Sequence, residues 1–157
     1  MEDNIYHLLD VDSKYFLTHL DERDTLYDKI WAAPETIQGL FFNSGTPAKV
    51  KSVCDHFKLT DEQSALLSRY IRNVTIANAY IGDMTADLQA QLGVDAQTAQ
   101  GIANALMTDL LVPAMGGISQ LQAEAFKDKI VQNQELMQKA AKTAGVPTKN
   151  VINLRDQ

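Results

Sequence analysis

The chain has 157 residues, of which 45% are hydrophobic and 22% charged, with a formal net charge of −6. This length is typical of one globular domain, and the composition excludes a disordered or low-complexity chain. The acidic balance disfavours binding to nucleic acid, because that affinity depends largely on Lys and Arg side chains that displace counterions from phosphates.

The first part of the chain, residues 1–45, is acidic. It holds 9 acidic and 3 basic residues, whereas residues 46–157 hold 11 of each. We interpret this part as a solvated acidic face that favours solubility, with binding of a basic partner as the alternative. Its first residues lack the basic region and the small-residue cleavage site of a signal peptide, so we expect a cytoplasmic protein.

Helical patterns dominate the rest of the sequence, and patterns typical of strands are nearly absent. The predicted helices are 13–32 with a break near 21–25, 34–42, 48–57, 61–81, 84–92, 96–111 and a long helix over 118–144. Thr60 and Gln63 have the spacing of a capping box at the start of the fourth of these helices. The sequence predicts an all-α fold, a compact bundle of six to eight helices with a long C-terminal helix and an extended C-terminal tail.

The helix that follows Gly93 carries a clear packing pattern. Gly93 ends the preceding helix and Asp95 caps the new one. Ala99 and Ala103 lie four residues apart on one face, so we expect a neighbouring helix to approach closely there. Gly101 lies off that face, and the sequence alone gives no reason for it.

The last predicted helix, 118–144, has apolar residues at alternating spacings of four and three, with Asn133 near the middle of this seam. Its apolar content is low, which favours antiparallel docking on the chain's own helices over a free coiled coil. A Gly-x-Pro sequence ends the helix. We therefore expect one helical domain over 1–146, with central helices over 46–111, and an extended tail over 147–157.

No pattern typical of a catalytic, metal or cofactor site is found. The histidines occur singly, at His7, His19 and His56, and no glycine-rich phosphate loop or nucleophile motif is present. Cys54 is the single cysteine, and on a helix its side chain points away from that of His56. We predict no catalytic residue, no metal site and no cofactor, and we interpret Cys54 as a buried apolar side chain.

Two groups of apolar side chains are candidate partner-binding sites. They are Val151, Ile152 and Leu154 with the adjacent Arg155 in the tail, and Trp31, Phe41 and Phe42 near the N-terminus. Apolar side chains on a terminal segment dock either on their own domain or in the groove or sheet edge of a partner. For the aromatic group, packing in the core of the helix elbow is the alternative.

Three functions remain open. The leading hypothesis is a non-enzymatic adaptor or subunit that binds another protein, or itself, through the long C-terminal helix and the apolar tail. The second is a helical bundle that binds a small molecule or a lipid in a cavity lined by Phe16, Tyr27, Trp31, Phe41, Tyr70 and Tyr80. The third is an enzyme in which carboxylates such as Glu22, Asp24 or Asp28 converge with a histidine. No apolar run approaches 18 residues, so we expect no membrane span.

The order of short motifs over residues 34–111 carries one resemblance. These motifs are P-E-x-I, K-V-x-x-V, L-T-D-E-Q and L-G-V-D-x-x-T-A-Q-x-I-A, and together they resemble uncharacterised small all-helical proteins of small-genome bacteria. The resemblance covers about half of the chain, and its motifs are helix caps and packing positions. It implies a compact helical core and a cytoplasmic bacterial protein, and it assigns no catalytic or binding residue.

Overall fold

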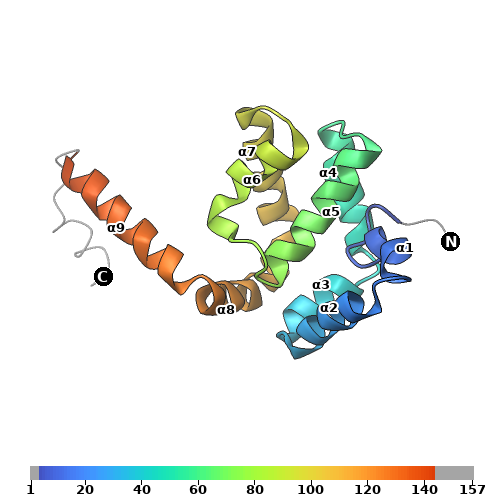
Figure 1. Cartoon of the computed structure of the whole chain (residues 1–157). Helices are drawn as coiled ribbons and strands as arrows, with labels where there is room; N and C mark the ends of the chain where they lie inside the picture. The colour runs from blue at the N-terminus through green and yellow to red at the C-terminus, as the bar shows by residue number, and fades with distance from the viewer. Residues whose placement is uncertain (1–3, 144–157) are drawn as a thin grey trace. The chain divides into compact units, whose positions relative to one another are not determined.

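The computed structural model describes residues 4–143, which form helices joined by short turns, with no strand among them. In chain order the elements are η1 (Asp10–Asp12), α1 (Ser13–Phe16), α2 (Leu20–Ala32), α3 (Glu35–Phe42), α4 (Thr46–His56), α5 (Asp61–Thr75), η2 (Ile81–Asp83), α6 (Met84–Leu92), α7 (Ala96–Ala105), η3 (Leu106–Leu111), η4 (Val112–Ala114), α8 (Met115–Ala125) and α9 (Lys127–Thr143). The all-α fold predicted from the sequence is confirmed (Figure 1). The predicted tail, 147–157, lies outside the described residues.

The contacts within the chain divide it into two compact units, residues 1–122 and 123–157. The sequence predicts a single domain over 1–146 and gives no sign of this division. It also predicts one helix over 118–144, where the structure has α8 and α9 separated by a bend at Phe126. The two helices also differ in burial, because α8 carries buried residues whereas α9 has none. The spacing of apolar residues is the same in both helices, so the sequence pattern does not show this difference in burial.

Among the described residues 4–143, the longest helical run spans 96–125, 30 residues that comprise α7, η3, η4 and α8. The sequence predicts a break over 112–117, yet the chain stays helical there. Pro113 has no N–H, and its ring crowds the carbonyl group four residues earlier, at Asp109. The helix accommodates this by widening to a π-helix over Leu106–Leu111 and tightening to a 3-10 turn over Val112–Ala114.

This run is also the one helix among residues 4–143 that is long and apolar enough, by length and composition alone, to cross a membrane. Its most apolar window is 44% buried. A core helix of a folded domain passes the same test. The result is consistent with the absence of a membrane span expected from the sequence.

Helix α5 is the central element of the first unit, and it packs against α4 and α6 (Figure 1). It begins with the predicted capping box, in which the Gln63 backbone N–H donates to the Thr60 hydroxyl at 3.1 Å. The Thr60 N–H donates in return to the Gln63 side-chain oxygen at 3.0 Å. The helix ends at Thr75, earlier than predicted, and Ala77 in the following turn has a positive φ of 60°.

The helix caps predicted around α7 are also confirmed. Gly93 has a φ of 66°, and the Asp95 carboxylate accepts a hydrogen bond from the Thr98 backbone N–H at 2.7 Å, which holds the pKa of Asp95 below its usual value. The structure also explains Gly101. A Cβ atom at this position would lie 2.9 Å from Cε1 of Phe57, so glycine leaves room for the aromatic ring that follows α4.

Candidate interaction surfaces

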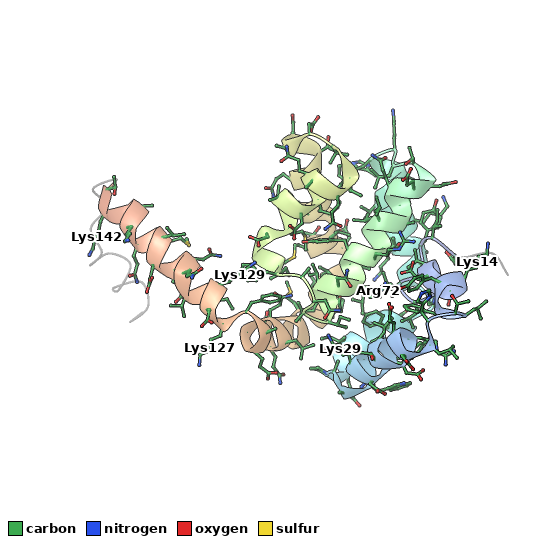
Figure 2. The ribbon with its side chains drawn as sticks, viewed as in Figure 1. Lys14, Lys29, Arg72, Lys127, Lys129 and Lys142 are labelled. Carbon is green, nitrogen blue, oxygen red and sulfur yellow. The ribbon has the colours of Figure 1, made fainter. Side chains whose placement is uncertain are left out.

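The N-terminal helices are fastened to α5 by a buried ion pair. Arg72, which is 8% exposed, donates from Nη2 to the Asp12 carboxylate at 2.7 Å and from Nη1 to the Leu8 carbonyl oxygen at 3.1 Å. Arg69 donates from Nε to the other Asp12 oxygen at 2.7 Å. Figure 2 shows Arg72 on α5 beside the N-terminal helices. These bonds hold the segment that precedes α2 against α5.

An exposed aromatic pair lies where α2 and α3 meet. Trp31 from the end of α2 and Phe42 from the end of α3 stack, with their ring centroids 5.0 Å apart. They are 61% and 46% exposed. The Gln38 side-chain amide donates to the carbonyl oxygens of Trp31 and Ala33, at 3.0 and 2.9 Å, and so fixes the corner between the helices.

The third aromatic candidate, Phe41, lies elsewhere. Consecutive residues of a helix point about 100° apart, and Phe41 is directed into the core, where it is only 1% exposed. The structure thus brings Trp31 and Phe42 together on the surface and places Phe41 out of reach of a partner. Phe41 therefore packs in the core, as the alternative interpretation expected, whereas Trp31 and Phe42 are exposed.

Two carboxylates lie within four residues of Trp31 in the sequence. Asp28 is one turn before Trp31 on α2, and Glu35 begins α3, and both are exposed. The nearby Lys29 donates to the side-chain oxygen of Asn78 at 2.6 Å. Trp31 is therefore flanked in the sequence by the acidic residues Asp28 and Glu35 and by the basic Lys29.

Helix α9 is the second exposed apolar surface. None of its 17 residues is buried, and three large apolar side chains are exposed by 46%, 63% and 73%: Val131, Leu136 and Met137. Lysines occur from its first turn to its last, as the labels of Lys127, Lys129 and Lys142 in Figure 2 show. The candidate residues Val151, Ile152, Leu154 and Arg155 lie outside the described residues.

A groove of about 330 Å³ lies within the first unit, between η2, α6, α7 and α8. Its apolar lining includes the three methionines Met84, Met107 and Met115, together with Ile81 and Ile118. One wall is polar: the Thr85 hydroxyl donates to the Gln100 side-chain oxygen at 3.3 Å, and the Gln100 amide donates to Asn104 at 2.9 Å. The sequence did not predict this groove, because its lining comes from three separate segments.

The six aromatic residues predicted to line a cavity do not line this groove. Phe16, Phe41 and Tyr70 are buried in the core, and Trp31 is exposed. The apolar part of the lining of this groove consists mainly of methionine and isoleucine side chains.

One predicted carboxylate, Glu22, and one histidine, His19, both contact the Tyr15 side chain. The Tyr15 hydroxyl donates to the Glu22 carboxylate at 3.0 Å, and the His19 ring stacks on the Tyr15 ring at 3.8 Å between centroids. The hydrogen bond to Glu22 raises the pKa of Tyr15, so the phenol holds its proton more firmly. All three side chains lie on the open surface, which is a poor setting for general acid–base chemistry.

Cys54 is buried, as predicted, at 1% exposure. Burial raises the pKa of its thiol, and the adjacent Ser64 hydroxyl offsets only part of that effect. A thiol with a raised pKa is a weak nucleophile at neutral pH. Among residues 4–143, no three His, Cys, Asp or Glu side chains are grouped so that they could hold a metal ion.

These surfaces define an all-α protein whose most distinctive described features are an exposed aromatic pair, a methionine-lined groove and a basic helix without buried residues. Comparison of the chain with protein-family models, with curated proteins and with solved structures found no match.

Proposed function

We propose that this protein is a non-enzymatic interaction subunit or adaptor, and that α9 is its principal binding element. The observation that supports this most strongly is that α9, a helix of 17 residues, has no buried residue while Leu136 and Met137 are exposed. An isolated helix of this length is only marginally stable in water. Docking on another chain both stabilises such a helix and removes its apolar side chains from water.

The spacing along α9 supports a helix that binds with one face. Ile130, Met137 and Ala141 are separated by seven and four residues, which places them on one stripe, and Leu136 lies at its edge. This is the spacing with which amphipathic helices enter apolar grooves of their partners. The apolar residues predicted in the tail extend the same proposal beyond the described part of the chain.

The Trp31–Phe42 pair is a second contact surface in this proposal. Large aromatic side chains at the centre of an interface contribute much of its binding energy. Asp28 and Glu35, which are within four residues of Trp31 in the sequence, favour a partner segment that carries both an apolar anchor and basic residues.

The test compares the full chain with a variant that carries Leu136→Glu and Met137→Glu. A matched control carries Gln132→Glu and Gln138→Glu, which adds the same charge to polar positions of α9. We expect wild type and control to form an assembly larger than the 17.4 kDa chain, either with itself or with a co-purifying protein that rebinds when both are pure. The Leu136/Met137 variant should remain a monomer and bind nothing.

Light scattering gives the mass, and circular dichroism verifies that the variants stay helical. A wild-type chain that is monomeric at all concentrations and has no stoichiometric, α9-dependent partner contradicts the proposal.

A small-molecule-binding bundle is the second candidate, and the groove of about 330 Å³ is the observation that favours it. Unexplained mass retained by the purified protein in native mass spectrometry, lost in a variant with Met107→Lys, would support it over the adaptor.

A further inference from the structure

We propose that the methionine-lined groove between η2, α6, α7 and α8 binds an uncharged small molecule that has a flat aromatic body and a carbonyl group. This inference is independent of the adaptor role of α9. It deepens the second candidate function, on which it rests, by giving the groove a class of ligand. Three observations support it: the charge of the lining, its apolar side chains and the hydrogen bonds of its polar wall.

The first observation is that the lining of the groove is uncharged. It contains no Asp, Glu, Lys, Arg or His side chain. A charged group that leaves water needs a partner of opposite charge, and the lining provides none. Residues 73–126, which supply the whole lining, contain 5 acidic residues and no Lys or Arg, so they also repel anions at longer range. The ligand that fits this groove is therefore uncharged.

The second observation is the apolar part of the lining. Met84, Met107 and Met115 lie there together with Ile81 and Ile118. Methionine side chains are unbranched and adapt to the shape of what they contact, and their sulfur atoms make favourable contacts with the edges of aromatic rings. The groove volume of about 330 Å³ is at the lower end of the range of small-molecule sites, ~300–1,000 Å³. These features suit a compact aromatic body.

The third observation is the direction of the hydrogen bonds along the polar wall. The Thr85 hydroxyl donates to the side-chain oxygen of Gln100, and the Gln100 amide donates to that of Asn104. Both amide oxygens are thus already acceptors. The Asn104 amide nitrogen carries two N–H groups, and within residues 4–143 it has no acceptor. The wall therefore ends in a donor, for which a carbonyl oxygen is the complementary group.

A helix is a poorer occupant of this wall than a small molecule. The carbonyl oxygens along a helix accept hydrogen bonds from the N–H groups of its own next turn, so its backbone offers Asn104 no free acceptor. A small molecule with a carbonyl group fills the apolar space and pairs with Asn104 at the same time. Occupation of the groove by α9 gives a different result in the experiment below.

The test uses three naphthalenes of nearly equal shape. 2-Acetylnaphthalene carries the carbonyl group, 2-isopropenylnaphthalene replaces its oxygen with a CH₂ group, and 2-naphthoate adds a negative charge. Methionine methyl groups labelled with ¹³C locate each molecule on the full-length chain by NMR, because three methionines line the groove whereas Met137 lies on α9.

We expect one molecule of the ketone to bind per chain and to shift the methyl signals of Met107 and Met115 but not that of Met137. 2-Naphthoate at the same concentration should shift none of them, because its charge has no partner. Asn104→Leu should raise the dissociation constant of the ketone by about fivefold, the factor for one neutral hydrogen bond. It should leave the hydrocarbon unchanged or bound more tightly.

Gln97→Leu is the matched control, because Gln97 is an exposed amide on α7 that does not line the groove. It should change neither dissociation constant. If Asn104→Leu disturbs folding, as shown by circular dichroism, Asn104→Asp replaces it, since the carboxylate keeps the shape of the amide and cannot donate to a ketone.

Three results overturn the proposal. One is that the ketone shifts neither Met107 nor Met115 up to its limit of solubility. Another is that Asn104→Leu weakens the ketone and the hydrocarbon equally, since the carbonyl group then does not pair with Asn104. The third is that the ketone binds only to the variant with Leu136→Glu and Met137→Glu, which shows that α9 covers the groove.

The failure of this inference can be told apart from that of the proposed function. Assembly through α9, measured by light scattering, does not depend on the ketone, so an α9-dependent complex without ketone binding keeps the adaptor. A different bound mass that is lost in Met107→Lys keeps the second candidate function and removes this class of ligand. A monomeric chain that binds the ketone through Asn104 keeps the ligand site and removes the adaptor.

Discussion

Asp12 and Arg72 form an ion pair with 2.7 Å between Oδ2 and Nη2, and their side chains are only 14% and 10% exposed. Removing one partner of a buried pair leaves the other charge without compensation. We therefore expect Asp12→Ala to lower the free energy of unfolding by about 3–5 kcal/mol, measured by urea unfolding followed by circular dichroism. Asp10→Ala is the control, because the Asp10 side chain is 57% exposed and its partner His7 is 3.6 Å away.

A double replacement separates the charge from the packing. Asp12→Leu with Arg72→Met removes both charges, and it should be more stable than Asp12→Ala alone. A loss of less than about 1 kcal/mol in Asp12→Ala, the size expected for a surface pair, contradicts the anchoring role of this ion pair.

The buried side chain of Gln122 forms a second set of hydrogen bonds between distant segments. It is 3% exposed, its amide donates to the carbonyl oxygens of Val74 and Ala79 at 2.9 and 2.8 Å, and its oxygen accepts from the Ile81 N–H at 3.0 Å. Gln122→Ala leaves these three backbone groups without that partner, so we expect a loss of about 2–3 kcal/mol in the free energy of unfolding. The exposed Gln120→Ala should change stability little, and equal effects from the two variants would show that Gln122 holds nothing together.

Two adjacent glycines should respond in opposite directions. A Cβ atom at Gly117 would lie 2.9 Å from Oγ1 of Thr36 and 3.1 Å from Cβ of Pro34, so Gly117→Ala forces α8 away from α3. A Cβ atom at Gly116 meets nothing within 4 Å. We expect Gly117→Ala to destabilise the protein by about 1–3 kcal/mol, and Gly116→Ala to stabilise it by up to about 1 kcal/mol, because alanine is the better helix former. Thermal unfolding of the pair tests the sign of each change.

Stability should also fall at alkaline pH because of Tyr70. Burial, and then the charge of Asp87 that accepts its hydrogen bond at 3.2 Å, raise the pKa of this phenol far above its usual value. Above pH ~10 the unfolded chain loses a proton that the folded chain retains. The free energy of unfolding therefore decreases as the pH rises, by about 1.4 kcal/mol per pH unit for this group. Tyr70→Phe should show a shallower decline between pH 10 and 11, and an unchanged slope would assign the effect to other groups.

The local signals in the sequence predicted the elements that depend on neighbouring residues. The capping box of Thr60 and Gln63 and the caps at Gly93 and Asp95 are interactions within three residues or one helix end, and all are present. The all-α fold follows from the same short-range periodicity. Such features can be predicted without knowledge of the tertiary structure.

The features that the sequence left unpredicted depend on contacts between distant segments. Gln122 binds groups more than forty residues away, and Arg72 binds Asp12 across 60 residues. From the sequence alone, glutamine and arginine are expected on the surface. Their burial is understood only when the distant groups that they bind are known. The groove is likewise made by three segments, and the bend at Phe126 interrupts a seam whose spacing continues unchanged across it.

The candidate sites divide in the same way. Sequence analysis named Trp31, Phe41 and Phe42 as one group, because composition does not show which side of a short helix faces the core. The packing of α3 sends Phe41 inward and Phe42 outward, and only then does the stack with Trp31 appear.

Trp31 is the single tryptophan of the chain, and it lies on the surface against Phe42. The tryptophan fluorescence of this protein therefore reports on the corner between α2 and α3 and carries little information about the core around α5. Its emission in the folded protein should already resemble that of an indole in water, so unfolding produces a small spectral change. A partner that covers the aromatic pair should instead shift the emission to shorter wavelength, which gives a built-in, label-free optical signal for binding at this corner.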